Sequence, residues 1–302
     1  MKLARWQANI MLLLTAMIWG TTYTFIKQAY EGHMTAGMMN AIRGFIYALL
    51  IFVFFHRIIR QMTRDDFRIG LIAGIINFLG YQIQTIGLNY TTPSKSAFLT
   101  ATYVVMIPFI VWLFLHQRPA GKSYLAIAIC FVGTLFLTNT IQTGFNFKIG
   151  DTLTLLSAFV FAAQIVYFSS KAAESNPFTV AFMLGIVQGV ASLIWSLIFE
   201  RGDYSSINWS VSIWPVLILA VFASFGAQTM QVVGQKFTDS TSSGLILMTE
   251  SLFGSLFSVL MGFDPLTSNL LIGGALIVVA IFMMEFSLKN IVAIRKRRRF
   301  GR

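Results

Sequence analysis

The sequence predicts an all-α polytopic membrane protein whose ten transmembrane helices form two inverted five-helix repeats. Three observations carry this prediction. Hydrophobic residues make up 56% of the 302 residues and charged residues only 11%, long apolar runs recur along the chain, and the second half of the chain repeats the first. Soluble domains carry about 25% charged residues, so this composition excludes an ordinary soluble enzyme.

Apolar runs of about 20 residues define the spans, because a helix of that length crosses the hydrocarbon core of a bilayer. Turn-forming and charged residues, such as Glu31-Gly32-His33 and Thr92-Pro93, separate the runs. The first run is too long for the apolar core of a signal peptide, so we expect a retained helix. The predicted spans are residues 8–29, 35–55, 67–88, 93–115, 121–140, 149–169, 177–199, 212–234, 240–262 and 267–288.

The basic residues predict the orientation of these spans. Ten spans place both termini on one side, and with cytoplasmic termini most of the 22 lysines and arginines fall on the cytoplasmic side. The positive-inside rule therefore predicts a multi-pass protein of the cytoplasmic (inner) membrane with both termini cytoplasmic. The basic tail directly follows a span, which favours contact with anionic lipid headgroups over nucleic acid.

An internal repeat divides the chain into residues 1–145, residues 146–289 and a basic tail of residues 290–302. The third and fourth spans match the eighth and ninth without a gap, and polar residues fall in register: Gln84 on Gln231, Ser96 on Ser243 and Thr102 on Thr249. Each half contains five spans, an odd number, so the halves must cross the membrane in opposite directions. Inverted repeats are characteristic of secondary transporters, whose site lies near the midplane between the halves.

Six of the spans carry a polar or aromatic stripe at i, i+4 and i+7, the spacing of one helix face. Polar groups are costly in hydrocarbon unless they face one another or a wet cavity, so the stripes favour a polar central pathway. The alternative is that single polar residues only bond neighbouring helices. The substrate-binding candidates on these stripes are Trp19, Thr22, Asn77, Tyr81, Gln84, Tyr103, Phe161, Gln164, Gln228, Gln231 and Glu250.

Two ionisable residues lie well inside spans. Glu250 is near the middle of the ninth span, where a lone charge is expensive, so we expect it to bind a proton or a cationic group of the substrate. A structural hydrogen bond to a neighbouring helix is the alternative. Arg43 in the second span is a possible substrate contact, a possible partner of Glu250 or a structural charge.

Motifs of soluble catalysis are missing from the sequence. It contains no GxxxxGK[ST] phosphate loop, no HExxH and no GxSxG, and its three histidines lie at span ends. Cys130 is the only cysteine, which leaves no cysteine cluster for a metal. We therefore expect no enzyme activity, no cofactor and no metal.

Several segments resemble the ten-helix, EamA-type branch of the drug/metabolite transporter superfamily. The segments are Ile18-Trp19-Gly20-Thr21-Thr22-Tyr23, Arg43-Gly44-Phe45, Ser96-Ala97-Phe98-Leu99-Thr100 and Glu250. The proline that usually follows the glutamate is here Ser251, and the acidic residue that commonly closes the fourth span is absent. The resemblance implies a basket of two inverted halves, with the fifth and tenth helices at its periphery.

The polar stripes, the internal repeat and the resemblance together predict a secondary transporter that exports or exchanges small metabolites by alternating access. The favoured substrates are amino acids or similar amphipathic compounds. Coupling to a proton through Glu250 and simple downhill flux both stay open. The alternative cargo is a cationic drug, a nucleobase or a sugar-linked compound. A membrane enzyme acting on lipid or isoprenoid substrates is the remote alternative. The expected partners are the substrate and the bilayer, and both a monomer and a homodimer fit the sequence.

Overall fold

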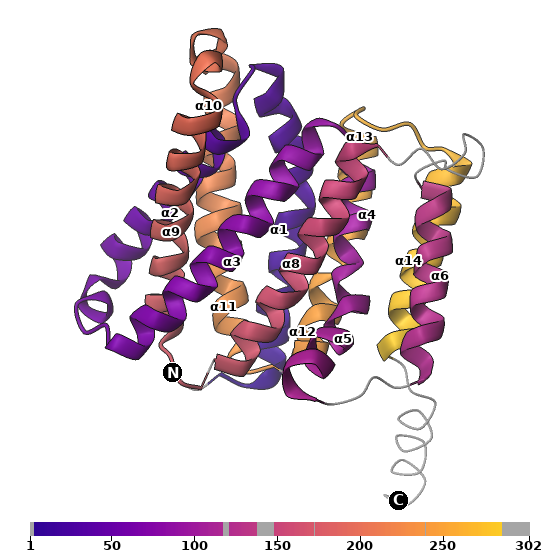
Figure 1. The fold of residues 1–302 in the computed structure, drawn as a ribbon, viewed down its shortest axis with the longest axis horizontal. Coiled ribbons are helices and arrows are strands. Elements are labelled where there is room, and N and C mark those ends of the chain that lie inside the picture. The colour runs from indigo at the N-terminus through magenta and orange to yellow at the C-terminus, as the bar shows by residue number, and fades with distance from the viewer. Residues whose placement is uncertain (1–2, 117–120, 138–147, 172, 239, 286–302) are drawn as a thin grey trace, which may run out of the picture.

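The computed structural model describes residues 3–116, 121–137, 148–171, 173–238 and 240–285, which form a bundle of helices (Figure 1). The helices of the first half are α1 (Arg5–Glu31), α2 (Ala36–Ile59), α3 (Arg64–Asn89), α4 (Pro93–Ala101), α5 (Tyr103–Leu115) and α6 (Gly121–Leu137). Those of the second half are α8 (Ile149–Lys171), α9 (Pro177–Phe199), η1 (Arg201–Ser206), α10 (Trp209–Ile218), η2 (Leu219–Gln228), α11 (Thr229–Gln235), α12 (Ser240–Leu247), α13 (Glu250–Leu260) and α14 (Ser268–Glu285).

Helices occupy all ten predicted positions, and the predicted fold class is confirmed. Within the described residues, seven helices or continuous runs of helix are long and apolar enough to cross a membrane. The remaining three positions, at α6, α13 and α14, hold shorter apolar stretches. The predicted tail of residues 290–302, with its lipid contact, and the predicted boundary between residues 145 and 146 lie outside the described residues.

Apolar side chains cover the outside of the bundle, and the interior combines apolar core clusters with many buried polar side chains. Large apolar side chains such as Phe54, Trp214 and Leu260 face outward, whereas the amides of Asn77 and Gln188 are fully buried. A soluble protein instead exposes mainly polar and charged side chains and seldom buries amides of this kind. Helices suit a lipid environment because they satisfy their own backbone hydrogen bonds, and the polar side chains then find partners within the bundle.

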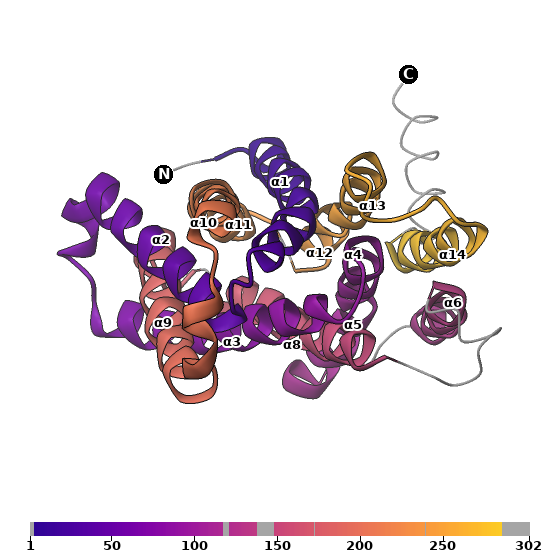
Figure 2. The same ribbon diagram turned by 90° about the horizontal axis from the view of Figure 1, so that it is seen from above.

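Packing between the helices follows the internal repeat. α2 packs along α9 and α6 along α14, which are counterparts in the two halves. α3 packs on α8 just as its counterpart, the run from α10 to α11, packs on α1. Figure 2 shows α2 and α9 at one end of the bundle and α6 and α14 at the other. The remaining helices of both halves lie between these two pairs and build the centre.

Capping side chains determine where several helices begin. The hydroxyl of Thr63 accepts from the backbone N–H of Asp66, and the Asp66 carboxylate accepts from the N–H of Thr63 in return. Thr92-Pro93 and Asn176-Pro177 each pair a capping side chain with a proline, which needs no hydrogen-bond acceptor in the first turn. Asp66 also accepts from the N–H of Asn176 at 2.8 Å, which joins the start of α3 to the start of α9.

Two of the ten spans are broken near their middles, at positions that the repeat relates. The fourth span breaks at Thr102 and the ninth at Met248 and Thr249. The hydroxyl of Thr102 donates to the carbonyl of Leu99 at 2.6 Å, and that of Thr249 donates to the carbonyl of Ile246 at 2.7 Å. Such local bonds compete with the regular helix ladder and accompany both breaks. The second break makes Glu250 the first residue of α13.

Candidate functional site

A narrow cavity lies at the centre of the bundle, with a volume of about 30 Å³. That volume holds only one or two water molecules. The lining residues come from both halves of the chain. They are Trp19, Tyr23, Tyr81, Gln84, Thr100, Tyr103, Phe161, Gln164, Ile165, Gln231 and Glu250.

The cavity brings together most of the predicted binding residues. Trp19, Tyr81, Gln84, Tyr103, Phe161, Gln164, Gln231 and Glu250 all line it. Thr22, Asn77 and Gln228 are buried but do not line it. Sequence reasoning missed Tyr23 and Ile165, and it placed Thr100 on a polar stripe without naming it as a binding residue. Tyr23 directly follows Thr22, so the signal was present but assigned to the adjacent position of α1.

Glu250 is the acid that lines the cavity, and a network of hydrogen bonds leads to its carboxylate. The hydroxyl of Tyr23 donates to Glu250 Oε1 at 2.9 Å. Gln84 Nε2 donates to the Tyr23 oxygen at 3.3 Å and to the hydroxyl of Thr100 at 3.1 Å. The break before α13 places the carboxylate in the first turn of a helix, where the helix dipole favours negative charge.

Aromatic rings form the walls of the cavity. Tyr81 and Phe161 meet edge to face, with ring centroids 5.4 Å apart. Gly80 makes this possible, because a Cβ at that position would come within 2.7 Å of the Phe161 ring. Trp19 is fixed by a 3.1 Å hydrogen bond from its indole N–H to the carbonyl of Ala223. Ala223 lies in η2, a π-helical stretch whose altered hydrogen-bond ladder accompanies this side-chain contact.

A buried network of amides lies beside the cavity and joins the halves. Asn77 Oδ1 accepts from Gln164 Nε2 at 2.6 Å and from Gln228 Nε2. Asn77 Nδ2 donates to Gln188 Oε1 at 2.9 Å. These bonds link α3 to α8, α9 and η2, so Asn77 and Gln228 serve the packing of the bundle here. Gln164 belongs to both the network and the cavity wall.

Arg43 is fully buried and contacts neutral groups. Its Nε donates to the hydroxyl of Ser224 at 3.2 Å, and its Nη1 donates to Asn40 Oδ1 at 3.3 Å. The guanidinium carbon lies 4.9 Å from the centre of the Tyr81 ring, so Tyr81 contacts Arg43 and also lines the cavity. The contacts of Arg43 and Glu250 do not include an ion pair between the two.

Comparison with known proteins gives a consistent result. A family profile described as the EamA-like transporter family matches residues 6–139 and residues 148–286. An uncharacterized transporter of Archaeoglobus fulgidus is 35% identical over 281 residues, which cover 93% of this chain and 86% of that protein. The uncharacterized transporter YvbV of Bacillus subtilis is 24% identical over 94% of this chain and 93% of its own length.

A solved crystal structure also superimposes on the chain. Its TM-score is 0.69 at 16% sequence identity, over 93% of this chain and 96% of the other. At that identity the likeness concerns the fold alone.

Proposed function

This chain belongs to the EamA-like transporter family, and from that premise we propose that it exports or exchanges small metabolites that carry an amino group, amino acids foremost. The substrate would bind in the central cavity, between the two halves, and reach either side of the membrane by alternating access. The observation that carries the proposal is the position of Glu250, a buried carboxylate among aromatic rings and amides.

Glu250 supplies the group that a protonated amine requires. A hydrogen bond between an ammonium and a carboxylate is stronger than a neutral one, and aromatic faces attract a cation in addition. Among the residues that line the cavity, Glu250 is the only acid, and none is a lysine or arginine. Because one carboxylate binds either a proton or an ammonium group, the same residue offers a route to proton coupling.

Two further groups in the cavity are available to an amino acid. The hydroxyl of Tyr103 and the Oε1 atom of Gln231 are buried and have no hydrogen-bond partner in the described part of the chain. Leaving such groups unpaired costs free energy, so a ligand that pairs them binds more tightly. Tyr103 would donate to the carboxylate of an amino acid, and Gln231 would accept from its ammonium group.

The two ends of the bundle differ in a way that fits alternating access. We call the end where α1 begins the terminal face and the end where α1 finishes the loop face. At the loop face lies a hollow of about 390 Å³, and at the terminal face one of about 20 Å³. With the termini cytoplasmic, as the basic residues predict, the larger hollow would face the outside of the inner membrane.

A cationic drug is the second candidate cargo, and the absence of lysine and arginine from the cavity lining favours it. A cationic drug would bind the Glu250 carboxylate and the aromatic rings. Unlike an amino acid, it has no carboxylate of its own that requires a hydrogen-bond donor. Proteoliposomes loaded with radiolabelled amino acids test the choice through competition for exchange. Inhibition by unlabelled amino acids supports the first candidate, whereas inhibition by quaternary ammonium compounds alone supports the second. Absence of flux for both classes under any gradient would refute the proposed transport.

A further inference from the structure

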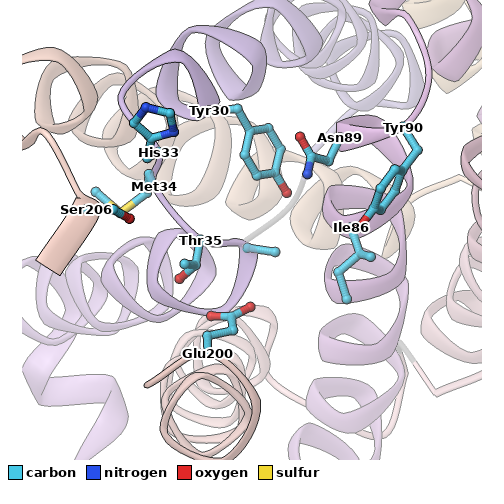
Figure 3. A pocket seen from close by; sticks show the side chains of 10 residues that line it. Tyr30, His33, Met34, Thr35, Ile86, Asn89, Tyr90, Glu200 and Ser206 are labelled. Atoms are coloured by element: carbon cyan, nitrogen blue, oxygen red, sulfur yellow. The ribbon is translucent and has the colours of Figure 1, made fainter. Parts of the chain in front are cut away.

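The hollow at the loop face is a separate cavity with its own chemistry. Figure 3 shows the carboxylate of Glu200 and the hydroxyl of Tyr30 pointing into it from opposite sides. Its volume of about 390 Å³ accommodates a small metabolite, which the central cavity of about 30 Å³ does not in this form. We call it the vestibule. Its polar and aromatic lining consists of Tyr30, His33, Thr35, Asn89, Tyr90, Glu200 and Ser206.

Glu200 is held in a fixed position at the wall of the vestibule. Both of its carboxylate oxygens accept from the backbone N–H of Gly37, at 3.0 and 3.1 Å, and Oε2 accepts from the hydroxyl of Ser196 at 2.7 Å. Among the lining residues that the structure describes, Glu200 is the acid, and none is a lysine or arginine. A fixed carboxylate beside two phenol rings is a suitable environment for an organic cation.

The vestibule and the central cavity are lined by residues of the same two helices, α1 and α3. On α1, Tyr23 lines the cavity and Tyr30 lines the vestibule, seven residues later on the same face and about 10 Å along the axis. On α3, Gln84 lines the cavity and Asn89 lines the vestibule. The hydroxyl of Tyr30 donates to the carbonyl of Thr85 at 2.8 Å. Tyr30 therefore ties α1 to α3 between the two spaces.

The repeat provides a counterpart to the vestibule at the terminal face. In the register that pairs Gln84 with Gln231, Asn89 pairs with Lys236, which lines the hollow of about 20 Å³ there. Lys236 Nζ donates to the carbonyl of Ser175 at 2.8 Å and so spans this hollow. The vestibule carries the carboxylate of Glu200, whereas the smaller hollow carries Lys171 and Lys236. The repeat therefore does not impose the carboxylate.

We infer that the vestibule is a second binding site for the amine carried by the central cavity, with Glu200 receiving the ammonium group and the rings of Tyr30 and Tyr90 covering it. The inference rests on the proposed function for the identity of the ligand. A transported amine would occupy the two sites in succession, with Tyr30 between them.

A single cysteine introduced into the vestibule wall tests this inference. Ser206 lines the vestibule and is changed to cysteine in a chain whose only native cysteine is removed by Cys130→Ala. The protein in lipid nanodiscs is alkylated by a maleimide with and without 2-phenylethylamine. The uncharged 2-phenylethanol, which has the same ring, is the control. We expect the amine to slow alkylation severalfold and saturably, and the alcohol to leave the rate unchanged.

Two carboxylate variants separate the vestibule from the central cavity. Glu200→Gln removes the charge at nearly constant size and should abolish the protection, whereas Glu250→Gln should retain it. Three outcomes would overturn the inference: no protection in the starting protein, protection that survives E200Q, or protection that disappears in E250Q. In each case the flux assay still tests the proposed function. An E250Q protein with wild-type flux and intact protection refutes the proposed function and retains the vestibule site.

Because Glu200 also contacts the first turn of α2, E200Q could lose protection through a folding defect alone. A second variant, away from that contact, separates the two explanations. Tyr90 lines the vestibule, is 54% exposed and lies outside the contact between Glu200 and Gly37. Tyr90→Leu keeps an apolar side chain but removes the aromatic face, which is worth about a two- to fivefold change in affinity at an exposed site. Weakened protection in Y90L supports the inference. Unchanged protection in Y90L contradicts it.

Discussion

Tyr23 on α1 donates a hydrogen bond of 2.9 Å to Glu250 on α13, so each half of the chain contributes one partner to the contact at the centre of the cavity. Both side chains are buried, and Gln84 on α3 completes the group through its bond to the Tyr23 oxygen. A ligand that binds Glu250 must therefore share it with a contact that joins the two repeats. This arrangement connects occupation of the cavity to the relative position of the halves.

Tyr23→Phe tests that connection. The change removes the donor to Glu250 and the acceptor of Gln84, while the ring and its packing stay. A hydrogen bond to a charged group contributes about 1.5–3 kcal/mol, so we expect substrate exchange at low concentration to fall at least tenfold. Counterflow in proteoliposomes measures the change. Thr24→Ser on the same helix is the control, because serine keeps the hydroxyl that bonds Thr21. Wild-type exchange in Y23F would contradict the role of this contact.

Arg43→Lys tests the role of the guanidinium at the interface between α2, α3 and η2. Lysine keeps the charge but has no planar fork with which to bond Ser224 and Asn40 while covering the Tyr81 ring. We expect a loss of about 1–3 kcal/mol of stability, seen as a lower melting temperature in detergent. Arg57→Lys, at an exposed position of the same helix, should melt like the wild type. Equal melting of both variants would show that Arg43 is dispensable for packing.

Gly44→Ala tests the close approach of α2 and α9. A Cβ at Gly44 would lie 2.3 Å from the backbone nitrogen of Gly189, which cannot move without shifting α9. Small residues permit such contact between helices in membranes. We expect a destabilisation of about 1–3 kcal/mol or more, measured by thermal melting. Gly226→Ala is the matched control, because its Cβ would meet only the carbonyl of Val221, at 3.5 Å. If the two variants melt alike, the helices pack less closely than described.

The fold was predictable from sequence because each span is a run of apolar residues of sufficient length. α9 begins and ends at the predicted residues, 177 and 199. The breaks at Thr102 and Thr249 and the π-helical stretch of η2 were not predicted. Hydropathy does not report them, because threonine and alanine fit a regular helix as well. Threonine hydroxyls on α1 make the same bonds to their own helix without a break, so residue type alone does not locate one.

The sequence predicted which helix faces turn toward the candidate site, but not which of their residues line a cavity. A stripe at i, i+4 and i+7 tells which face of a helix turns inward, and Tyr81, Gln84 and Gln231 do line the cavity. The same stripes include Asn77 and Gln228, which bond each other in the packed interface beside it. Whether an inward residue meets a space or another side chain depends on the partner helices. The vestibule also eluded prediction, since its lining comes from the ends of several helices that are distant in sequence.

The most direct measurement of the central claim is exchange of radiolabelled amino acids in proteoliposomes that contain the wild-type protein, Glu250→Gln or Glu174→Gln. Glu174 is an exposed carboxylate paired with Lys171 at the terminal face, so its loss controls for charge removal outside the cavity. Loss of the charge-assisted hydrogen bond predicts at least a tenfold fall in exchange for E250Q, with loss of its pH dependence, and wild-type exchange for E174Q. Wild-type exchange and pH dependence in E250Q would contradict substrate binding at Glu250.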